Sequence, residues 1–360
     1  MAKRFHLAVL LAVAGLAAIP AELPAKGIAA NVQGATAPGL PYRYVAISPG
    51  FPYRASSDDL PDRVTVVARI DKQGGRVGRW WYLPGSYSIP AAAYDDRTGG
   101  LSADGGTLVL SRFSWISPPR TTGLAVLDTD LHLGHPREGQ RPRHAIRRVN
   151  LKGGFSFDAI SPDGSTIYLI EHLTPYYGGP YQVRALRAKT GKLVTDPIVD
   201  PSEPWERMEG TPISRVTSPD GRWAYTLYSD HLKGKYDQAH EPFIHALDTV
   251  AGRAICIDLP QLEGRPASFQ LRLEVADGGR RLEVLDRPPR SEGSRALLAV
   301  DTRDFEVSRP SPVATASSGI GPWPAIVALS AIAAALLAWI GLRRGGKPRT
   351  DQRWTVAVSS

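Results

Sequence analysis

The sequence is poor in sulfur-containing residues, with one cysteine and two methionines among 360 residues. Cys256 cannot form a disulfide within the chain, so we expect a fold that is held by its hydrophobic core. It lies in the apolar run Ala254–Ile257, which favours a buried small hydrophobic residue over a nucleophile. No compact spacing of metal ligands occurs, and the sequence predicts neither a metal nor a cofactor.

Signature motifs of catalysis are also missing. The chain contains no Gly-x-Ser-x-Gly, no phosphate-binding glycine loop and no His-Glu-x-x-His. The net charge of +8 is concentrated at the ends, where residues 1–25 carry +1 and residues 343–360 carry +4. About +3 is left for the long stretch between them, which argues against a basic domain and against nucleic acid as a partner.

The ends of the chain carry apolar runs. Lys3 and Arg4 precede an apolar stretch that ends at Pro20 and is followed by small residues, the pattern of a secretory signal peptide over 1–25. Residues 324–342 are uncharged and long enough to cross a hydrocarbon core of roughly 30 Å. Arg343 and Arg344 follow directly and stop transfer. We therefore predict a single-pass protein of the cell membrane with an extracytoplasmic ectodomain (26–309), a linker (310–322), a transmembrane helix (323–342) and a short cytoplasmic tail (343–360).

One short pattern recurs between these ends. Its copies are Ser161-Pro-Asp-Gly164, Ser218-Pro-Asp-Gly221 and Ser102-Ala-Asp-Gly105, with weaker ones at Val275–Gly278 and Ala37–Leu40. In chain order the copies start 65, 59, 57 and 57 residues apart. A fixed period of this size is typical of an array of equivalent structural units.

The recurring residues have a clear role in turns. Proline fixes φ, aspartate bonds its own backbone, and glycine supplies positive φ, so each copy closes a hairpin between the first and second strands of a unit. A calcium site would need oxygens from several turns to converge, which one aspartate per unit does not provide. We therefore assign structural roles, on the face away from the variable loops, to Asp104, Gly105, Asp163, Gly164, Asp220, Gly221, Asp277 and Gly278.

Each unit predicts four short strands, rich in β-branched and aromatic residues. First strands are expected at 88–94, 155–160, 213–217 and 269–275, and the least clear fourth strand near 144–149. A third strand that ends in Asp-Thr, such as Leu124–Thr129, precedes the second hairpin. The chain is thus all-β, and five such units imply a β-propeller of about five four-stranded blades, with the first or last blade incomplete. A unit can be missed in a single sequence, so six blades stay open.

These turns and strands resemble exported bacterial β-propeller repeats of the YVTN, TolB-like and WD40-like types. The resemblance covers residues 37–309 and concerns the scaffold; the unit of about 57 residues is longer than usual, and Tyr-Val-Thr-Asn does not occur. It implies that the loops between second and third strands gather on one face around a central channel. Binding residues often lie on such loops. The candidates there and in a neighbouring loop are Tyr53, Asp59, Trp115, Glu171, His172, Tyr176, Tyr177, Trp205, Glu206, Asp230, His231, Tyr236 and His240.

Two acid–histidine pairs, Glu171-His172 and Asp230-His231, follow equivalent strands. They could bind a metal or act as a carboxylate-oriented base, or be polar rim residues that bond their own loops. We interpret the chain as an extracytoplasmic module that binds a protein or glycan. The alternative is a carbohydrate-active hydrolase or lyase on the same scaffold, which would need paired carboxylates. A receptor that signals through the tail would need a docking motif, and none is visible.

Overall fold

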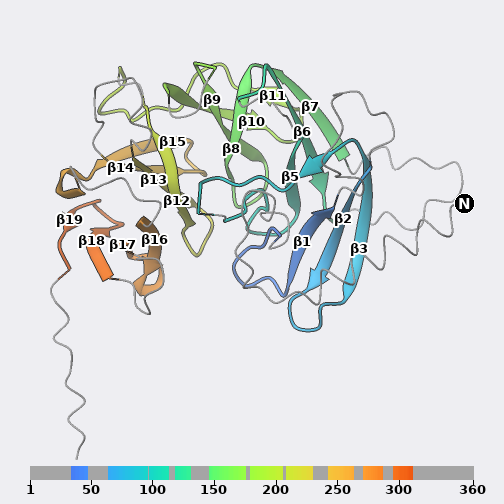
Figure 1. Ribbon diagram of the computed structural model, residues 1–360, viewed down its shortest axis with the longest axis horizontal. Helices are drawn as coiled ribbons and strands as arrows, with labels where there is room; N and C mark the ends of the chain where they lie inside the picture. The colour runs from blue at the N-terminus through green and yellow to red at the C-terminus, as the bar shows by residue number, and fades with distance from the viewer. Residues whose placement is uncertain are drawn as a thin grey trace, which may run out of the picture. The chain divides into compact units, whose positions relative to one another are not determined.

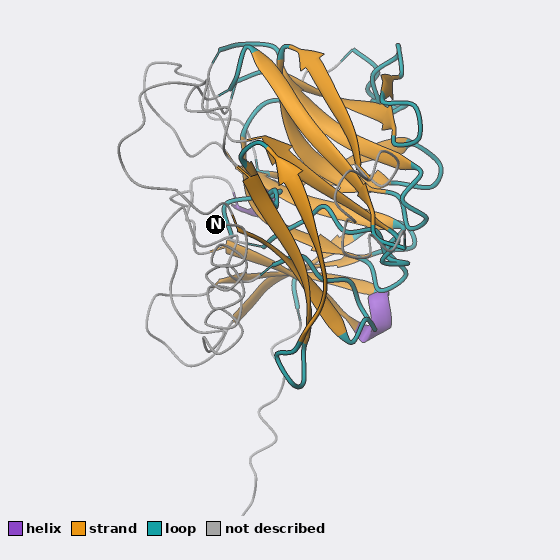
Figure 2. Ribbon diagram, turned by 90° about the vertical axis from the view of Figure 1, so that its right-hand side faces the viewer, coloured by secondary structure: helices purple, strands orange, loops and turns teal. Residues whose placement is uncertain are grey.

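The computed structural model describes residues 34–47, 64–95, 97–112, 118–130, 146–175, 179–205, 208–229, 242–262, 271–286 and 295–310. Their contacts place the strands in one compact unit, which ends at Arg309. Apart from two short 3-10 turns, at Pro260–Leu262 and Asp277–Gly279, their regular structure is β-strand (Figure 2). Among these residues no helix has the length and apolar character needed to span a membrane. The predicted signal peptide, transmembrane helix and tail lie outside the described ranges.

The strands form five antiparallel sheets, which we number blades 1 to 5 (Figure 1). Each blade is built from strands that are consecutive in the chain. Blade 1 consists of β1 (Tyr42–Ile47), β2 (Val64–Asp71) and β3 (Val77–Pro84), and blade 2 of β4 (Tyr87–Ser88), β5 (Thr107–Arg112), β6 (Thr121–Asp128) and β7 (Ile146–Lys152). Blade 3 consists of β8 (Gly154–Ile160), β9 (Thr166–His172), β10 (Tyr181–Arg187) and β11 (Lys192–Leu193), blade 4 of β12 (Thr211–Thr217), β13 (Trp223–Ser229), β14 (Phe243–Asp248) and β15 (Arg253–Asp258), and blade 5 of β16 (Leu271–Ala276), β17 (Arg281–Asp286), β18 (Arg295–Asp301) and β19 (Val307–Ser308).

This architecture confirms the predicted all-β propeller fold with mostly four-stranded blades. Blade 1 is the incomplete one: its first strand is reduced to a single bridge between Ala35 and Tyr44. The uncertain fourth strand of the second unit is β7, close to the range expected from the sequence.

Neighbouring blades are held together by apolar side chains, which lie on both faces of the sheets of blades 2, 3 and 4. In β5, Leu108 and Leu110 pack against blade 1, whereas Val109 packs against blade 3. This alternation follows from the two-residue period of a strand, since successive side chains point to opposite faces. Such shared cores join blades 1 and 2, 2 and 3, 3 and 4, and 4 and 5.

The repeated turns have nearly the same geometry in three copies. In the third unit Ser161 Oγ donates to Asp163 Oδ1 at 2.6 Å, and Asp163 Oδ1 also accepts from the amide of Ser165 at 3.0 Å. The same bonds form around Asp104 and Asp220. The serine hydroxyl lowers the pKa of Asp163 because it stabilises the carboxylate. The copy in the fifth unit, which matches the pattern less well, differs. There Asp277 has a φ of 51°, and its Oδ2 forms an ion pair with Arg281 Nη1 at 3.0 Å.

These turns also pack on one another from blade to blade. The amide of Asp104 donates to the carbonyl of Pro162 at 3.1 Å. Gly164 has a φ of 69°, and a Cβ added there would overlap Oγ1 of Thr107 in blade 2. A Cβ on Gly221 would lie 2.6 Å from that of Ala103. These glycines are therefore required for two reasons, their positive φ and the close approach of a turn from another blade, blade 2 in both cases.

The expected first strand of the second unit, 88–94, is wrong in part. Only Tyr87 and Ser88 form β4, and strand pairing resumes with the bridge between Leu101 and Leu108. Between these points residues 89–99 leave the sheet as a loop, which we call the channel loop. Its second residue, Pro90, has no N–H group, and the chain returns to the sheet at Gly100, which has a φ of 90°.

Candidate functional site

The channel loop runs from blade 2 to inner strands of other blades. Its own ends are joined by the bridge between Ala91 and Thr98. Its tip reaches blade 4, where the amide of Tyr94 donates to the carbonyl of Pro212 at 3.0 Å. On the way, Thr98 donates its hydroxyl to the carbonyl of Gly34 at 2.5 Å, and Gly99 lies against the ring of Phe157 in blade 3. The loop therefore fills part of the central channel.

Asp95 fixes the tip of this loop. Its side chain is fully buried, and Oδ2 accepts from Ser214 Oγ at 2.7 Å and from the amide of Arg215 at 3.0 Å. Ser214 Oγ in turn accepts from the amide of Leu273 in blade 5 at 3.0 Å. The guanidinium groups of Arg97 and Arg272 lie 3.7 and 3.9 Å from the carboxylate. One carboxylate thus ties together blades 2, 4 and 5.

A second buried pair lies beside the channel loop. Arg215 of β12 contacts Oδ1 of Asp158 in β8 through Nη1, which also donates to Thr226 Oγ1 at 2.9 Å. Asp158 is 1% exposed and Arg215 7% exposed. The other carboxylate oxygen of Asp158, Oδ2, has no hydrogen-bond partner in the described part of the chain. This is unusual, because buried polar atoms are nearly always hydrogen-bonded.

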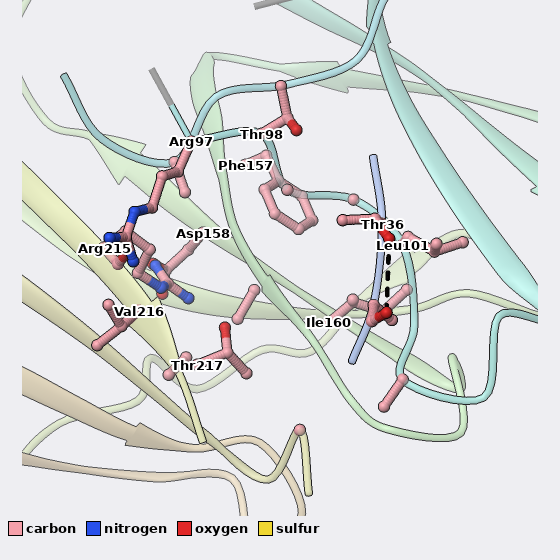
Figure 3. Close-up of a pocket in the computed structure, with 18 of the residues that line it drawn as sticks. Thr36, Arg97, Thr98, Leu101, Phe157, Asp158, Ile160, Arg215, Val216 and Thr217 are labelled. Carbon is pink, nitrogen blue, oxygen red and sulfur yellow. Dashed lines mark hydrogen bonds and ion pairs between the residues drawn. The ribbon is translucent and has the colours of Figure 1, made fainter. Parts of the chain in front are cut away.

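The pair forms part of the wall of a cavity of about 180 Å³ in the channel (Figure 3). The segment before β1, the channel loop and blades 2, 3 and 4 contribute to its lining. Figure 3 shows Arg97, Arg215 and Asp158 grouped on one side of it, with Thr217 below them and Phe157 above. Arg97 has 46% of its side chain exposed and donates to the carbonyl of Arg215 at 3.4 Å. The cavity is therefore lined by a residue with an unpaired carboxylate oxygen, by a guanidinium and by hydroxyls beside an aromatic ring.

Behind Asp158, between blades 3 and 4, lies a cluster of further buried polar atoms. The rings of Tyr181 and Tyr228 stack at 5.1 Å, and that of His245 lies 6.5 Å from Tyr228. The hydroxyls of both tyrosines and both ring nitrogens of His245 have no hydrogen-bond partner among the described residues. Burial raises the pKa of both tyrosines and lowers the pKa of His245, so all three side chains are neutral near pH 7.

Of the rim candidates, the structure describes Glu171, His172 and Trp205. Glu171 Oε2 accepts from Arg184 at 2.6 Å and from Gln182 at 2.7 Å, both on β10. His172 Nε2 instead lies 2.7 Å from Ser156 Oγ on β8, and burial lowers its pKa to about 4. Adjacent strand residues point to opposite faces, so the structure does not join this acid and histidine into one site.

Trp205 is 93% exposed, in the connection between β11 and β12. The other rim candidates lie outside the described residues: Tyr53, Asp59, Trp115, Tyr176, Tyr177, Glu206, Asp230, His231, Tyr236 and His240. In the described ranges no three histidine, cysteine, aspartate or glutamate side chains gather in a way that could hold a metal ion.

Sequence reasoning missed the channel residues Arg97, Asp158 and Arg215. A signal was present in the spacing of the repeats, because the first interval of 65 residues exceeds the later ones of 59, 57 and 57 and contains the channel loop. Asp158 and Arg215 lie near the ends of first strands in successive units, where the repeat alone makes them look like ordinary strand residues.

The sequence matches no protein-family model and no curated protein. Solved structures that resemble it include hydrazine synthase of Kuenenia stuttgartiensis, with 15% identity over 68% of this chain and 59% of that one, at a TM-score of 0.37. The β-propeller domain of the Trilobed protease from Pyrococcus furiosus has 10% identity over 76% and 70% of the two chains, at a TM-score of 0.38. A TolB-like protein of Agrobacterium tumefaciens has 12% identity over 69% and 75%, at a TM-score of 0.35. Likeness at this level concerns the propeller fold alone, which the five sheets establish independently.

Proposed function

We propose that the chain is a membrane-anchored, extracytoplasmic ligand-binding module whose propeller takes a small hydroxylated ligand, about one sugar residue in size, in the channel cavity. The observation behind this proposal is that Oδ2 of Asp158 is buried and has no hydrogen-bond partner among the described residues, while Asp158 itself lines the cavity. A carboxylate oxygen left without a donor is costly in a protein interior. A ligand hydroxyl that donates to it would remove this cost.

The rest of the lining suits the same chemistry. A hydroxyl can donate one hydrogen bond and accept others. Asp158 can accept from the ligand, while the guanidinium of Arg97 and the hydroxyl of Thr217 can donate to it. Phe157 supplies an apolar wall for the carbon face of a sugar ring. The cavity of about 180 Å³ is smaller than the roughly 300–1,000 Å³ of pockets for drug-sized ligands, so the occupant is small.

The contacts of the channel favour binding over the alternative of a hydrolase or lyase. Glycoside hydrolysis uses one carboxyl group as acid and a second one as base or nucleophile. Asp95 is held by Ser214 and the amide of Arg215, and one oxygen of Asp158 is held by the Arg215 guanidinium. The described channel therefore supplies no second carboxylate that is free to act together with the unpaired Oδ2 of Asp158, because both oxygens of Asp95 accept hydrogen bonds.

A thermal-shift screen of the detergent-solubilised full chain tests the site. Neutral monosaccharides, uronic acids and amino acids form the panel. We expect at least one sugar to raise Tm, since a ligand that binds only the folded state stabilises it. Stabilisation by amino acids alone would contradict the ligand class. A panel without any effect on Tm would contradict the site.

The anchoring part of the proposal derives from the sequence, through the apolar runs at 5–18 and 324–342. Protease added to intact cells should digest the propeller and spare the tail after Arg344. Protection of the propeller in intact cells would overturn this topology.

A further inference from the structure

The cavity beside Asp158 lies at one end of the channel, next to the repeated turns. Its lining includes the last residues of the first strands of blades 3 and 4, which directly precede these turns: residues 157–160 of β8 and 215–217 of β12. Ala103 and Gly221, which belong to the turns of blades 2 and 4, also line it. The residues that begin β8 and β12 do not. The cavity therefore occupies the turn end of the channel.

The channel loop closes the other side of the cavity. Ala92 and residues 97–99 of the loop belong to the lining, and Ala92 is buried. The tip of the loop is fixed to the far end of β12, because the amide of Tyr94 donates to the carbonyl of Pro212 at 3.0 Å. Pro212 is the second residue of β12, whereas Thr217 is its last. The loop therefore lies between the cavity and the end of the channel where β12 begins.

The exposed residues of the lining mark its opening. Four of the lining residues are exposed: Thr36, Pro38, Arg97 and Thr217. The lining residues of the strands and turns of blades 2 and 3 are buried or half-buried. Thr36 and Pro38 lie at the first turn of blade 1, and Thr217 directly precedes the first turn of blade 4. Figure 3 shows Thr36 and Thr217 on different sides of the cavity. The described lining therefore opens between the turns of blades 1 and 4.

A cavity of about 180 Å³ with one opening selects the end of a chain. A residue within a glycan chain has two neighbours and needs two ways out of its site, whereas a terminal residue has one neighbour and needs one. We propose that the opening between the turns of blades 1 and 4 is the entrance of the ligand site, and that the site takes the terminal residue of a glycan whose remainder leaves between these turns. This inference rests on the proposed function and specifies its ligand further.

The entrance is tested with bulky substitutions in the detergent-solubilised full chain. Thr36→Trp and Thr217→Trp narrow the opening at exposed positions, and Thr190→Trp, at an exposed threonine of another turn outside the lining, is the matched control. Stopped-flow fluorescence follows binding of 4-methylumbelliferyl glycosides of the neutral sugars of the panel. We expect association to be about tenfold slower or more in the first two variants and unchanged in the control. Thr217→Val, which removes a hydroxyl without narrowing the opening, should instead speed dissociation.

The direction of the chain is tested with glycosides that carry a benzophenone group, at the anomeric carbon in one series and at O4 in another. At least one series should bind within about threefold of the methyl glycoside and, on irradiation, label peptides that contain residues 36–38 or Thr217.

Three results would overturn this inference and leave the proposed function standing. They are binding of methyl glycosides but of neither benzophenone series, labelling at the starts of β8 and β12, and unchanged association in both Thr36→Trp and Thr217→Trp. A parent chain that binds no sugar would overturn the proposed function, and this inference with it.

Discussion

Replacing Gly164 with alanine tests whether the repeated turns also join the blades. At a φ of 69° an alanine is strained, which costs roughly 1–2 kcal/mol. The new Cβ would also lie 2.5 Å from Cβ of Thr107 in blade 2. Overpacking of this kind costs roughly 1–3 kcal/mol. We expect Gly164→Ala to lower the free energy of unfolding by roughly 2–5 kcal/mol in total.

Gly278→Ala is the control, because Gly278 has a similar φ of 66° and a Cβ there meets nothing within 4 Å. It should cost only the roughly 1–2 kcal/mol of backbone strain. Thermal unfolding of the detergent-solubilised full chain, followed by circular dichroism, measures both. The double variant Gly164→Ala/Thr107→Ala should recover part of the loss, since it removes Oγ1 of Thr107, the atom nearest to the new Cβ. Equal losses for the two glycine variants would refute the role of this turn between blades.

Three further predictions concern the buried pair and the pH dependence of stability. Arg215→Met should lower the free energy of unfolding, measured with denaturant, by about 3–5 kcal/mol, because it leaves Asp158 buried and unpaired. The double variant Arg215→Met/Asp158→Leu should have a free energy of unfolding closer to that of the parent. The pKa of His172 is lowered to about 4, so its contribution to stability is complete above about pH 6.5 and is lost as pH falls toward 4. In the His172→Gln variant the midpoint of unfolding should therefore depend less on pH between about 6.5 and 4. Asp163→Ala should cost about 1 kcal/mol at pH 7. Because the pKa of Asp163 is lowered, that difference should vanish as pH falls below about 3.9, and a difference that persists in acid would contradict the assigned role of the carboxylate.

The sequence predicted the parts of the fold that depend on local chemistry. A repeated Asp and Gly fix a turn through bonds between near neighbours, so the hairpins at Asp163 and Asp220 could be located without a structure. A propeller of about five blades with an incomplete first or last blade followed from the period, whereas the exact number of blades and the position of the incomplete one did not.

The channel could not be predicted in this way, because its contacts join residues that are far apart in the chain. Asp95 is bonded to Ser214, which lies 119 residues away, and Asp158 to Arg215 across 57 residues. The contacts of Glu171 could not be predicted either, although its partners lie only one strand further along the chain. Its pattern with His172 suggested a rim site, but the pairing of β9 with β10 places it against Arg184.

The central claim, a ligand site at Asp158, is tested most directly by calorimetric titration of the full chain with the sugars of the panel. Asp158→Asn removes the unpaired acceptor, Thr217→Val removes a hydroxyl at the cavity wall, and Asp163→Asn is a control on a turn. The account predicts saturable binding of at least one sugar, weakened about tenfold or more by the two cavity variants and unchanged by the control. Binding that is equally strong in all four proteins, or absent from the parent, would contradict it.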